Sequence, residues 1–350
     1  MKLCLLVNSG FEELAKQEVE ELVNKKIQVS TQVLEVEATP EEALKLATHL
    51  QSVRRILIAF DSVTEINKAK FDPKLLSQLF FDENTFKVEV EQVKGNSTRI
   101  EIAQKIAGEV FSCFDKVKLD LRKPESYVVV FFNGERYFIG LDLVGKEINS
   151  REYRIFLSPA SFKGDLAYYF VRSSGLKIGE QLLIGFAKDG TLAIEAVLFM
   201  NQLPVLKQNE FWKKIPILAK TAYYTNPVKE KMMVQATDTN MQNITATRKN
   251  SILAGCKDYL GAQKYSLDEW DIKFSKEQFD RIILQVTTKD EDEINEIYYQ
   301  TSYVLKHGGF LMLIGRPTWD LTISEKFELI ECKEIFKGES GYKFWLLKRL

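Results

Sequence analysis

The sequence is poor in the residues that build metal centres and disulfide frameworks. Its 350 residues include only 4 Cys and 2 His. No two cysteines form a C-x-x-C pair, so we expect no zinc or other metal site and no disulfide-stapled fold. Such usage is typical of a reducing compartment and predicts a cytoplasmic location. The residues concerned are Cys4, Cys113, Cys256, Cys332, His49 and His307.

Long hydrophobic runs and an excess of charge of one sign are also missing. No apolar stretch approaches the roughly 20 residues of a membrane-spanning helix, so no membrane partner is expected. Met1 to Val7 is too short for a signal peptide and predicts a first β-strand. With 48 Lys and Arg against 49 Asp and Glu, the net charge is −1. Any surface for nucleic acid must therefore be a local patch.

The composition that remains is that of an ordinary globular protein, with 45% hydrophobic and 28% charged residues. The length suffices for two or three domains. At the start of the chain, strand-like and helix-like patterns alternate up to about residue 60. The strands are expected at 2–7, 29–36 and 54–60, and the helices at 12–24 and 40–50. This order predicts a small ferredoxin-like α+β unit.

A second unit follows, with a different order of elements. Residues 86–93 alternate apolar and polar side chains as a half-buried strand does, and a helix is expected over 99–111. Gly134-Glu135 separates two strand-like runs and indicates a β-hairpin. From about residue 165, buried runs alternate with helical patterns, which predicts a mostly parallel sheet covered by helices on both faces. These runs are 182–184, 232–234, 281–284 and 310–314.

The segment from Leu182 to Ala196 has the outline of a strand, a glycine turn and a helix. Nucleotide-binding α/β folds hold their cofactor at such a turn, where glycines let the backbone approach the ligand. Here Lys188 and Asp189 occupy positions that would need bare backbone. The sequence therefore predicts the strand, turn and helix of a cofactor site, in which some of the residues that would bind the cofactor have been replaced.

Several motifs carry a resemblance to a known family. V-K-G-N-S at 93–97, I-A-Q-K-I-A-G at 102–108 and V-K-L-D-L-R-K-P-E at 117–125 resemble a THUMP domain, the RNA-binding module of tRNA- and rRNA-modifying enzymes. R-E-Y-R at 151–154 resembles the R-x-Y-R link into the catalytic domain of THUMP-bearing guanine-N2 methyltransferases, and N-S-G-F-E-E-L-A at 8–15 is similar to their start. The resemblance covers essentially the whole chain.

This family implies an α/β fold in four parts. They are a ferredoxin-like domain at 1–62, a THUMP domain at 63–150, a linker at 151–165 and a Rossmann-like methyltransferase domain at 166–350. The THUMP domain implies an RNA partner, in particular tRNA, contacted through basic side chains. The alternative is that these are ordinary solvated charges interleaved with acidic ones. The candidates are Lys94, Arg99, Lys105, Lys118, Arg122, Lys123, Arg151 and Arg154.

In the family, a D-P-F-C-G-S-G-T motif holds S-adenosylmethionine. On this chain it falls on 184–191, so that Lys188 replaces the first glycine of the turn. Gly190, Thr191 and Glu195 persist as residual cofactor-binding positions. Asp238 lies where the family places a carboxylate on the cofactor ribose, although it also suits the cap of the following helix.

The family's N-P-P-Y motif binds the target guanine, and its catalytic positions are Gln285 and Thr288 here. A glutamine has a longer arm than an asparagine, and methyl transfer requires closely aligned reacting atoms. The prolines and the stacking ring of the motif are missing. The acidic run from Asp290 to Glu293 follows the loop, where it would repel RNA phosphates; it also suits a solvated helix start.

Three hypotheses follow. In the first, the chain is an RNA-binding, catalytically inactive methyltransferase relative that uses no cofactor and acts as a subunit, for example beside an active methyltransferase paralogue. In the second, it is an active S-adenosylmethionine-dependent tRNA (guanine-N2) methyltransferase with an atypical pocket, using Gln285 and Asp238. In the third, the altered pocket binds another ligand or a protein.

Overall fold

The computed structural model describes residues 1–350 except 207–209, 222, 224, 226–227, 229–230 and 338–339. The chain forms two compact units. Unit 1 comprises Met1–Ile148 and Leu206–Tyr224, and unit 2 comprises Asn149–Val205 and Thr225–Leu350. The segment 151–165, expected as a linker, lies within unit 2.

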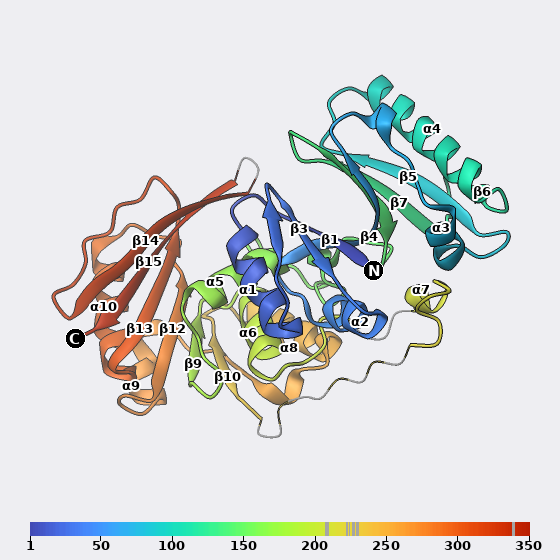
Figure 1. The fold of residues 1–350 in the computed structure, drawn as a ribbon. Helices are drawn as coiled ribbons and strands as arrows, with labels where there is room; N and C mark the ends of the chain where they lie inside the picture. Colours follow the sequence, from blue (N-terminus) through green and yellow to red (C-terminus); the bar gives the residue numbers. More distant parts are fainter. Residues whose placement is uncertain (207–209, 222, 224, 226–227, 229–230, 338–339) are drawn as a thin grey trace. The chain divides into compact units, whose positions relative to one another are not determined.

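Unit 1 is built on one eight-stranded sheet, in the order β2-β3-β1-β4-β8-β7-β5-β6 (Figure 1). The ranges 1–62 and 63–150 share this sheet because β4 pairs with β8 along its length. Gln32 has a φ of 60° between β2 and β3, so the single strand expected over 29–36 is two strands. The elements are β1 (Lys2–Val7), α1 (Glu12–Val23), β2 (Gln28–Ser30), β3 (Val33–Glu37), α2 (Pro40–His49), β4 (Val53–Val63), α3 (Pro73–Leu79), β5 (Thr85–Glu91), α4 (Asn96–Cys113), β6 (Lys118–Leu119), β7 (Ser126–Phe132), β8 (Tyr137–Asp142) and α7 (Glu210–Lys213).

Local sequence explains the best-defined helix start in unit 1. Thr39 accepts a hydrogen bond from the Glu42 backbone, and the Glu42 carboxylate accepts one from the Thr39 backbone. This capping box satisfies two N–H groups that the first turn leaves open. Pro40, at the first helical position, has no N–H to satisfy. The start of α2 was therefore predictable from Thr39, Pro40 and Glu42.

Unit 2 contains a seven-stranded sheet, in the order β11-β10-β9-β12-β13-β15-β14. The strands from β11 to β13 are parallel and β15 runs antiparallel to its neighbours, which confirms the expected mostly parallel sheet. Strand β10 begins at Val234, so the strand expected at 232–234 lies further along the chain. The elements are α5 (Gly164–Ser173), β9 (Leu182–Gly185), α6 (Thr191–Met200), β10 (Val234–Thr237), α8 (Met241–Ala254), β11 (Leu260–Gln263), α9 (Trp270–Lys273), β12 (Phe279–Gln285), α10 (Glu291–Val304), β13 (Leu305–Gly315), β14 (Phe327–Lys337) and β15 (Ser340–Arg349).

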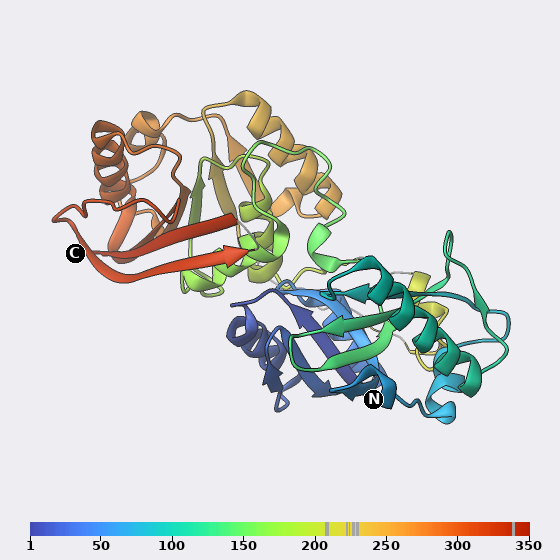
Figure 2. The ribbon, with the colours of Figure 1, turned by 90° about the horizontal axis from the view of Figure 1, so that it is seen from above.

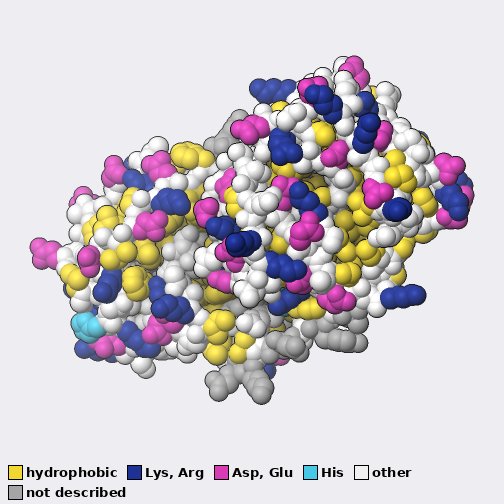
Figure 3. Space-filling view, viewed as in Figure 1, with side chains coloured by type: hydrophobic (Ala, Val, Ile, Leu, Met, Phe, Trp, Pro, Cys, Tyr) yellow, Lys and Arg dark blue, Asp and Glu magenta, His cyan; other side chains and the backbone are white. Residues whose placement is uncertain are grey.

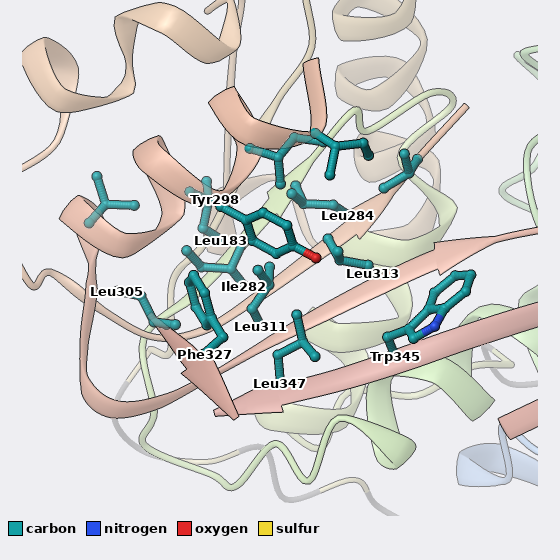
Figure 4. Packing of buried hydrophobic residues seen from close by; sticks show 14 of the residues in the cluster. Leu183, Ile282, Leu284, Tyr298, Leu305, Leu311, Leu313, Phe327, Trp345 and Leu347 are labelled. Carbon is teal, nitrogen blue, oxygen red and sulfur yellow. The ribbon is translucent and has the colours of Figure 1, made fainter. Parts of the chain in front are cut away.

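Helices cover both faces of this sheet (Figures 1 and 2). On one face, Tyr298 of α10 points toward the apolar side chains of β12 and β13 (Figure 4). On the other face, Phe170 of α5 packs edge-on against Phe344 of β15, with ring centroids 6.4 Å apart. Because both faces are buried, the centre of β12 from Ile282 to Leu284 is entirely apolar, as is usual for parallel strands in such folds.

Candidate cofactor and RNA sites

The candidate cofactor residues lie at the carboxyl ends of three adjacent parallel strands. Strand β9 pairs with β10 on one side and with β12 on the other. The chain leaves β9 toward β10 and later returns to place β12 on the opposite side. In open α/β sheets, ligands bind in the crevice at such a switch point. The turn after β9, Asp238 after β10 and Gln285 at the end of β12 all meet there.

The turn after β9 has an unusual backbone. Phe186, Lys188 and Gly190 have φ angles of 53°, 55° and 81°. Gly190 is required, because a Cβ atom there would lie 2.6 Å from Cγ2 of Thr247 in α8. Lys188 has the left-handed conformation without being glycine, at a cost of about 1 to 2 kcal/mol. The turn therefore retains its packing against α8 and has a side chain where the family has none.

Asp238, the expected ribose acceptor, is bound to the turn and to the helix that follows it. Its carboxylate accepts hydrogen bonds from the Lys188 backbone (3.0 Å), the Asn240 backbone (2.8 Å) and Asn243 Nδ2 (3.0 Å). The side chain that caps α8 is Asn240, which accepts from the Gln242 backbone. Asp238 thus has a structural role, different in detail from the helix cap considered from the sequence.

Asp189 and Thr191 close the other side of the turn. The Asp189 carboxylate accepts hydrogen bonds from both the backbone and the hydroxyl of Thr191, and both residues are buried. Arg154 donates to Thr191 Oγ1 at 3.0 Å and to Ser161 Oγ at 3.2 Å, and lies 3.4 Å from Asp189. The guanidinium of Arg154 therefore binds side chains of unit 2 instead of pointing into solvent.

Arg151 and Glu195 form a fully buried ion pair. Both side chains are 0% exposed, and Arg151 donates two hydrogen bonds to Glu195, of 2.7 and 2.8 Å. The hydroxyl of Tyr153 donates to the same carboxylate at 2.6 Å. Burial and the adjacent Glu195 charge raise the pKa of Tyr153 well above its ordinary value. Arg151 was expected to contact RNA and Glu195 a cofactor; in this structure the two buried side chains contact each other.

The residues at the N-P-P-Y positions also contact protein groups. Gln285 Nε2 donates to the Ala160 carbonyl at 2.7 Å. Thr288 Oγ1 accepts from the Asp290 backbone, and Asp290 caps α10 by accepting from the backbones of residues 292 and 293. The acidic run is therefore a solvated helix start.

These contacts make one continuous arrangement with the connecting segment (residues 151–161). Besides Arg151, Tyr153, Arg154 and Ala160, Phe156 exchanges two backbone hydrogen bonds with the Asn250 side chain, and Ser158 donates to Asn243. Asn250 also donates to the Asp189 carbonyl. The segment is thus bound to the turn, α6, α8 and β12.

Among the residues that the structure describes, those at the switch point line a very small cavity. A cavity of about 10 Å³ remains. That volume holds about one water molecule, whereas drug-sized ligands occupy pockets of about 300 to 1,000 Å³. The cavity that these residues form in this structure is too small for S-adenosylmethionine. The lining comprises Ser161, Phe162, Ile184, Phe186, Ala187, Lys188, Asp189, Thr191, Leu192 and Gln285.

The basic residues expected to bind RNA in unit 1 fall mainly into two groups. Arg99 lies near the carboxyl end of β5, where its Nε donates to the Val93 carbonyl. Residues 118–123 lie at the other end, because Lys118 pairs with Thr85 and the Asp120 backbone donates to the Phe86 carbonyl. The seven residues of β5 separate these ends by about 20 Å. The exposed members are Lys94 and Arg99 at one end, Lys105 in the middle of α4, and Lys118 (paired with Glu83), Arg122 and Lys123 at the other end.

The described residues offer neither a metal site nor a membrane span. In the part of the chain that the structure describes, no three His, Cys, Asp or Glu side chains group as a metal site. No helix among those residues is both long enough and apolar enough to cross a membrane.

The strand order of unit 2, its antiparallel seventh strand and the turn after β9 define a Rossmann-like methyltransferase domain. Residues 151–313 match the RMKL-like methyltransferase domain, and residues 70–142 match the THUMP domain. The chain thus combines a THUMP domain with an RMKL-like methyltransferase domain.

Two curated relatives illustrate the similarity. The ribosomal RNA large subunit methyltransferase K/L of Acinetobacter baumannii is 24% identical over 299 residues, which are 75% of this chain and 40% of the relative. The tRNA (guanine(6)-N2)-methyltransferase of Archaeoglobus fulgidus is 22% identical over 167 residues, which are 46% of this chain and 42% of the relative. The chain thus spans about two fifths of the length of these relatives.

Solved structures share the whole fold. TrmN from Thermus thermophilus has a TM-score of 0.72 and 17% identity, covering 100% of this chain and 99% of TrmN. SMU.472, solved in complex with SAH, has a TM-score of 0.74 and 15% identity, covering 99% and 97% of the two chains.

Sequence reasoning missed the residues that bind the connecting segment to the turn. Asn243, Asn250 and Ser158 contact partners between 50 and 100 positions away along the chain. The one available signal was Asn250, because A-T-R-K-N-S-I-L-A-G at 246–255 resembles the A-R-x-N-x-x-x-A-G helix of THUMP-bearing guanine-N2 methyltransferases. Its role required the fold.

Proposed function

We propose that this protein binds tRNA through its THUMP domain, and that its methyltransferase domain has lost S-adenosylmethionine binding and serves as an RNA-binding or partner subunit. An active methyltransferase paralogue is the expected kind of protein partner. The proposal extends the two domain matches to a specific RNA class and to an inactive site.

The observation that carries the proposal is the cavity of about 10 Å³ at the switch point. The cofactor of the family would need both open space and free polar groups there. Asp238, the acceptor suited to a ribose, already accepts three hydrogen bonds, one of them from the Lys188 backbone. Gln285, at the position that would hold the guanine, donates to the Ala160 carbonyl.

The RNA half of the proposal is supported by the THUMP match and by the exposed basic residues of unit 1. It does not depend on the methyltransferase pocket. Loss of catalysis therefore leaves RNA binding as an activity that the chain can still perform.

Isothermal titration with S-adenosylmethionine tests the first half, and titration of the same preparation with bulk tRNA tests the second. We expect no heat with the cofactor and saturable, salt-dependent binding of tRNA. Binding of the cofactor at micromolar affinity, or transfer of a labelled methyl group to tRNA, would support the active enzyme instead. In that case Gln285→Ala should abolish the transfer.

A further inference from the structure

Strand β14 is an exposed sheet edge over most of its length. It is the last strand of the unit 2 sheet and pairs with β15. All seven residues from Glu328 to Glu334 are exposed, so both of its faces are open to solvent. Leu329, Ile330 and Phe336 add apolar surface, being 47%, 47% and 58% exposed. Figure 3 shows hydrophobic side chains among charged ones over this part of the molecule.

An edge strand offers unpaired backbone N–H and C=O groups to another strand, and proteins commonly protect such edges with charges. The charges of β14 have a particular order, Glu331-Cys332-Lys333-Glu334. When a second β14 strand runs antiparallel to the first and is centred on Cys332, Glu331 of one strand lies opposite Lys333 of the other. The edge is therefore complementary to itself in one antiparallel register.

We propose that a second copy of this chain pairs with the β14 edge, antiparallel and two-fold symmetric about Cys332. The two seven-stranded sheets would then be continuous. This inference does not depend on the loss of cofactor binding.

The symmetry restricts the possible registers. In an antiparallel pair, residues directly opposite each other lie on the same face of the sheet. The register with β15 places Glu331 and Lys333 opposite Leu346 and Phe344, on the face of α5, where Lys333 also lies over the Tyr169 ring at 5.8 Å. Cys332 lies opposite Trp345, on the other face.

A two-fold axis must therefore place one residue of the strand directly opposite its own copy. Centring on Glu331 sets two glutamates opposite each other, and centring on Lys333 sets two lysines opposite each other, which is destabilising. Centring on Cys332 sets Glu331 opposite Lys333 of the second copy, twice. Only this one of the three central registers avoids like charges.

The same register predicts a specific covalent trap. Residues directly opposite in an antiparallel pair have Cα atoms about 4.5 to 5.5 Å apart, which is within the range for a disulfide. Cys332 is exposed, whereas Cys4 and Cys256 are buried and Cys113 is half-buried. Mild oxidation of the full chain should therefore give a dimer joined at Cys332.

The experiment combines sedimentation velocity over a micromolar concentration series with cross-linking by mild oxidation. We expect a reversible dimer, trapped in wild type and in Cys113→Ser but not in Cys332→Ser. Glu331→Lys and Lys333→Glu should each weaken the dimer by about tenfold or more, because two attractive pairs become repulsive. The double variant Glu331→Lys/Lys333→Glu should restore it.

A monomer at every concentration would overturn the proposal. So would a dimer that neither single reversal weakens, since it would use another surface. The double variant keeps the test valid if one single variant folds poorly, because it retains both charges and exchanges only their positions.

Discussion

The backbone N–H of Lys188 donates a hydrogen bond of 3.0 Å to the carboxylate of Asp238. The two residues follow adjacent strands, β9 and β10, and are 50 positions apart in the chain. The bond joins a turn that has a lysine in place of glycine to the carboxylate best suited to a cofactor ribose. Asp238, which was expected to bind the ligand, thus stabilises the turn that would have surrounded that ligand.

Asp238→Ala should lower the free energy of unfolding by about 1 to 3 kcal/mol, because it leaves three part-buried donors without their charged acceptor. Urea denaturation measures the change. Asp268→Ala, at an exposed carboxylate, is the control and should stay within about 0.5 kcal/mol of wild type. An Asp238→Ala protein as stable as wild type would mean that the carboxylate is free for a ligand.

Lys188→Gly should be more stable than Lys188→Ala by about 0.5 to 1 kcal/mol. Both variants remove the charge, but only glycine relieves the left-handed backbone at a φ of 55°, and its larger unfolded-state entropy offsets part of the gain. Thermal and urea denaturation of the two variants provide the comparison. Equal stability would show that the turn stores no strain at this residue.

Glu195→Gln should destabilise unit 2 by about 3 to 5 kcal/mol, because it leaves the buried Arg151 charge without its partner. Glu65→Gln removes one member of the exposed Lys68–Glu65 pair and should cost less than about 1 kcal/mol. Replacing both Arg151 and Glu195 with apolar residues, as in Arg151→Met/Glu195→Leu, should recover part of the loss. If the double variant is less stable than Glu195→Gln, the ion pair itself is a net source of stability.

Arg122→Ala/Lys123→Ala should weaken tRNA binding and reduce the dependence of log K on log salt by about 2, since each phosphate contact contributes about 0.9. Fluorescence anisotropy at several salt concentrations measures both quantities. Lys257→Ala/Lys276→Ala removes two exposed lysines from the methyltransferase domain and is the matched control. Equal losses in both variants would argue that binding is an unspecific effect of net charge.

The stability of the protein should fall at high pH in part through Cys4. Burial raises the pKa of the Cys4 thiol from 9.0 to about 12. Between these values the unfolded chain loses a proton that the folded chain keeps, so stability is complete below pH 9 and declines as the pH rises. The advantage of wild type over Cys4→Ala should shrink by up to about 1.4 kcal/mol per pH unit in this window. Urea denaturation at a series of pH values, with Cys332→Ala as the control for loss of a thiol, tests this; a constant difference would contradict it.

Much of the fold was predictable because its signals are local. The capping box of Thr39 and Glu42, the alternation in β5 and the apolar run of β12 each fix an element within a few residues. The THUMP and methyltransferase motifs were also readable, and family comparison confirms them. The sequence did not show that the ranges 1–62 and 63–150 share one sheet, since the pairing of β4 with β8 joins strands about 80 residues apart.

The candidate site was predictable in position but not in its contacts. Sequence placed Asp238 and Gln285 at the ends of strands, and the structure brings both to the switch point beside Gly190. It could not show that Gln285 contacts the Ala160 carbonyl, 125 positions earlier. Arg151 is the clearest example, because an arginine in a basic family motif gives no sign that it will be buried against Glu195.

The sequence by itself determined most of the elements, the two domain types and the motif residues that were replaced, since these depend on periodicity, capping and identity along the chain. Only the tertiary structure decided whether a ligand-sized space and free polar groups remained, because distant segments compete for the same donors and acceptors. The carboxylate of Asp238, for example, accepts a hydrogen bond from the Lys188 backbone of the same chain.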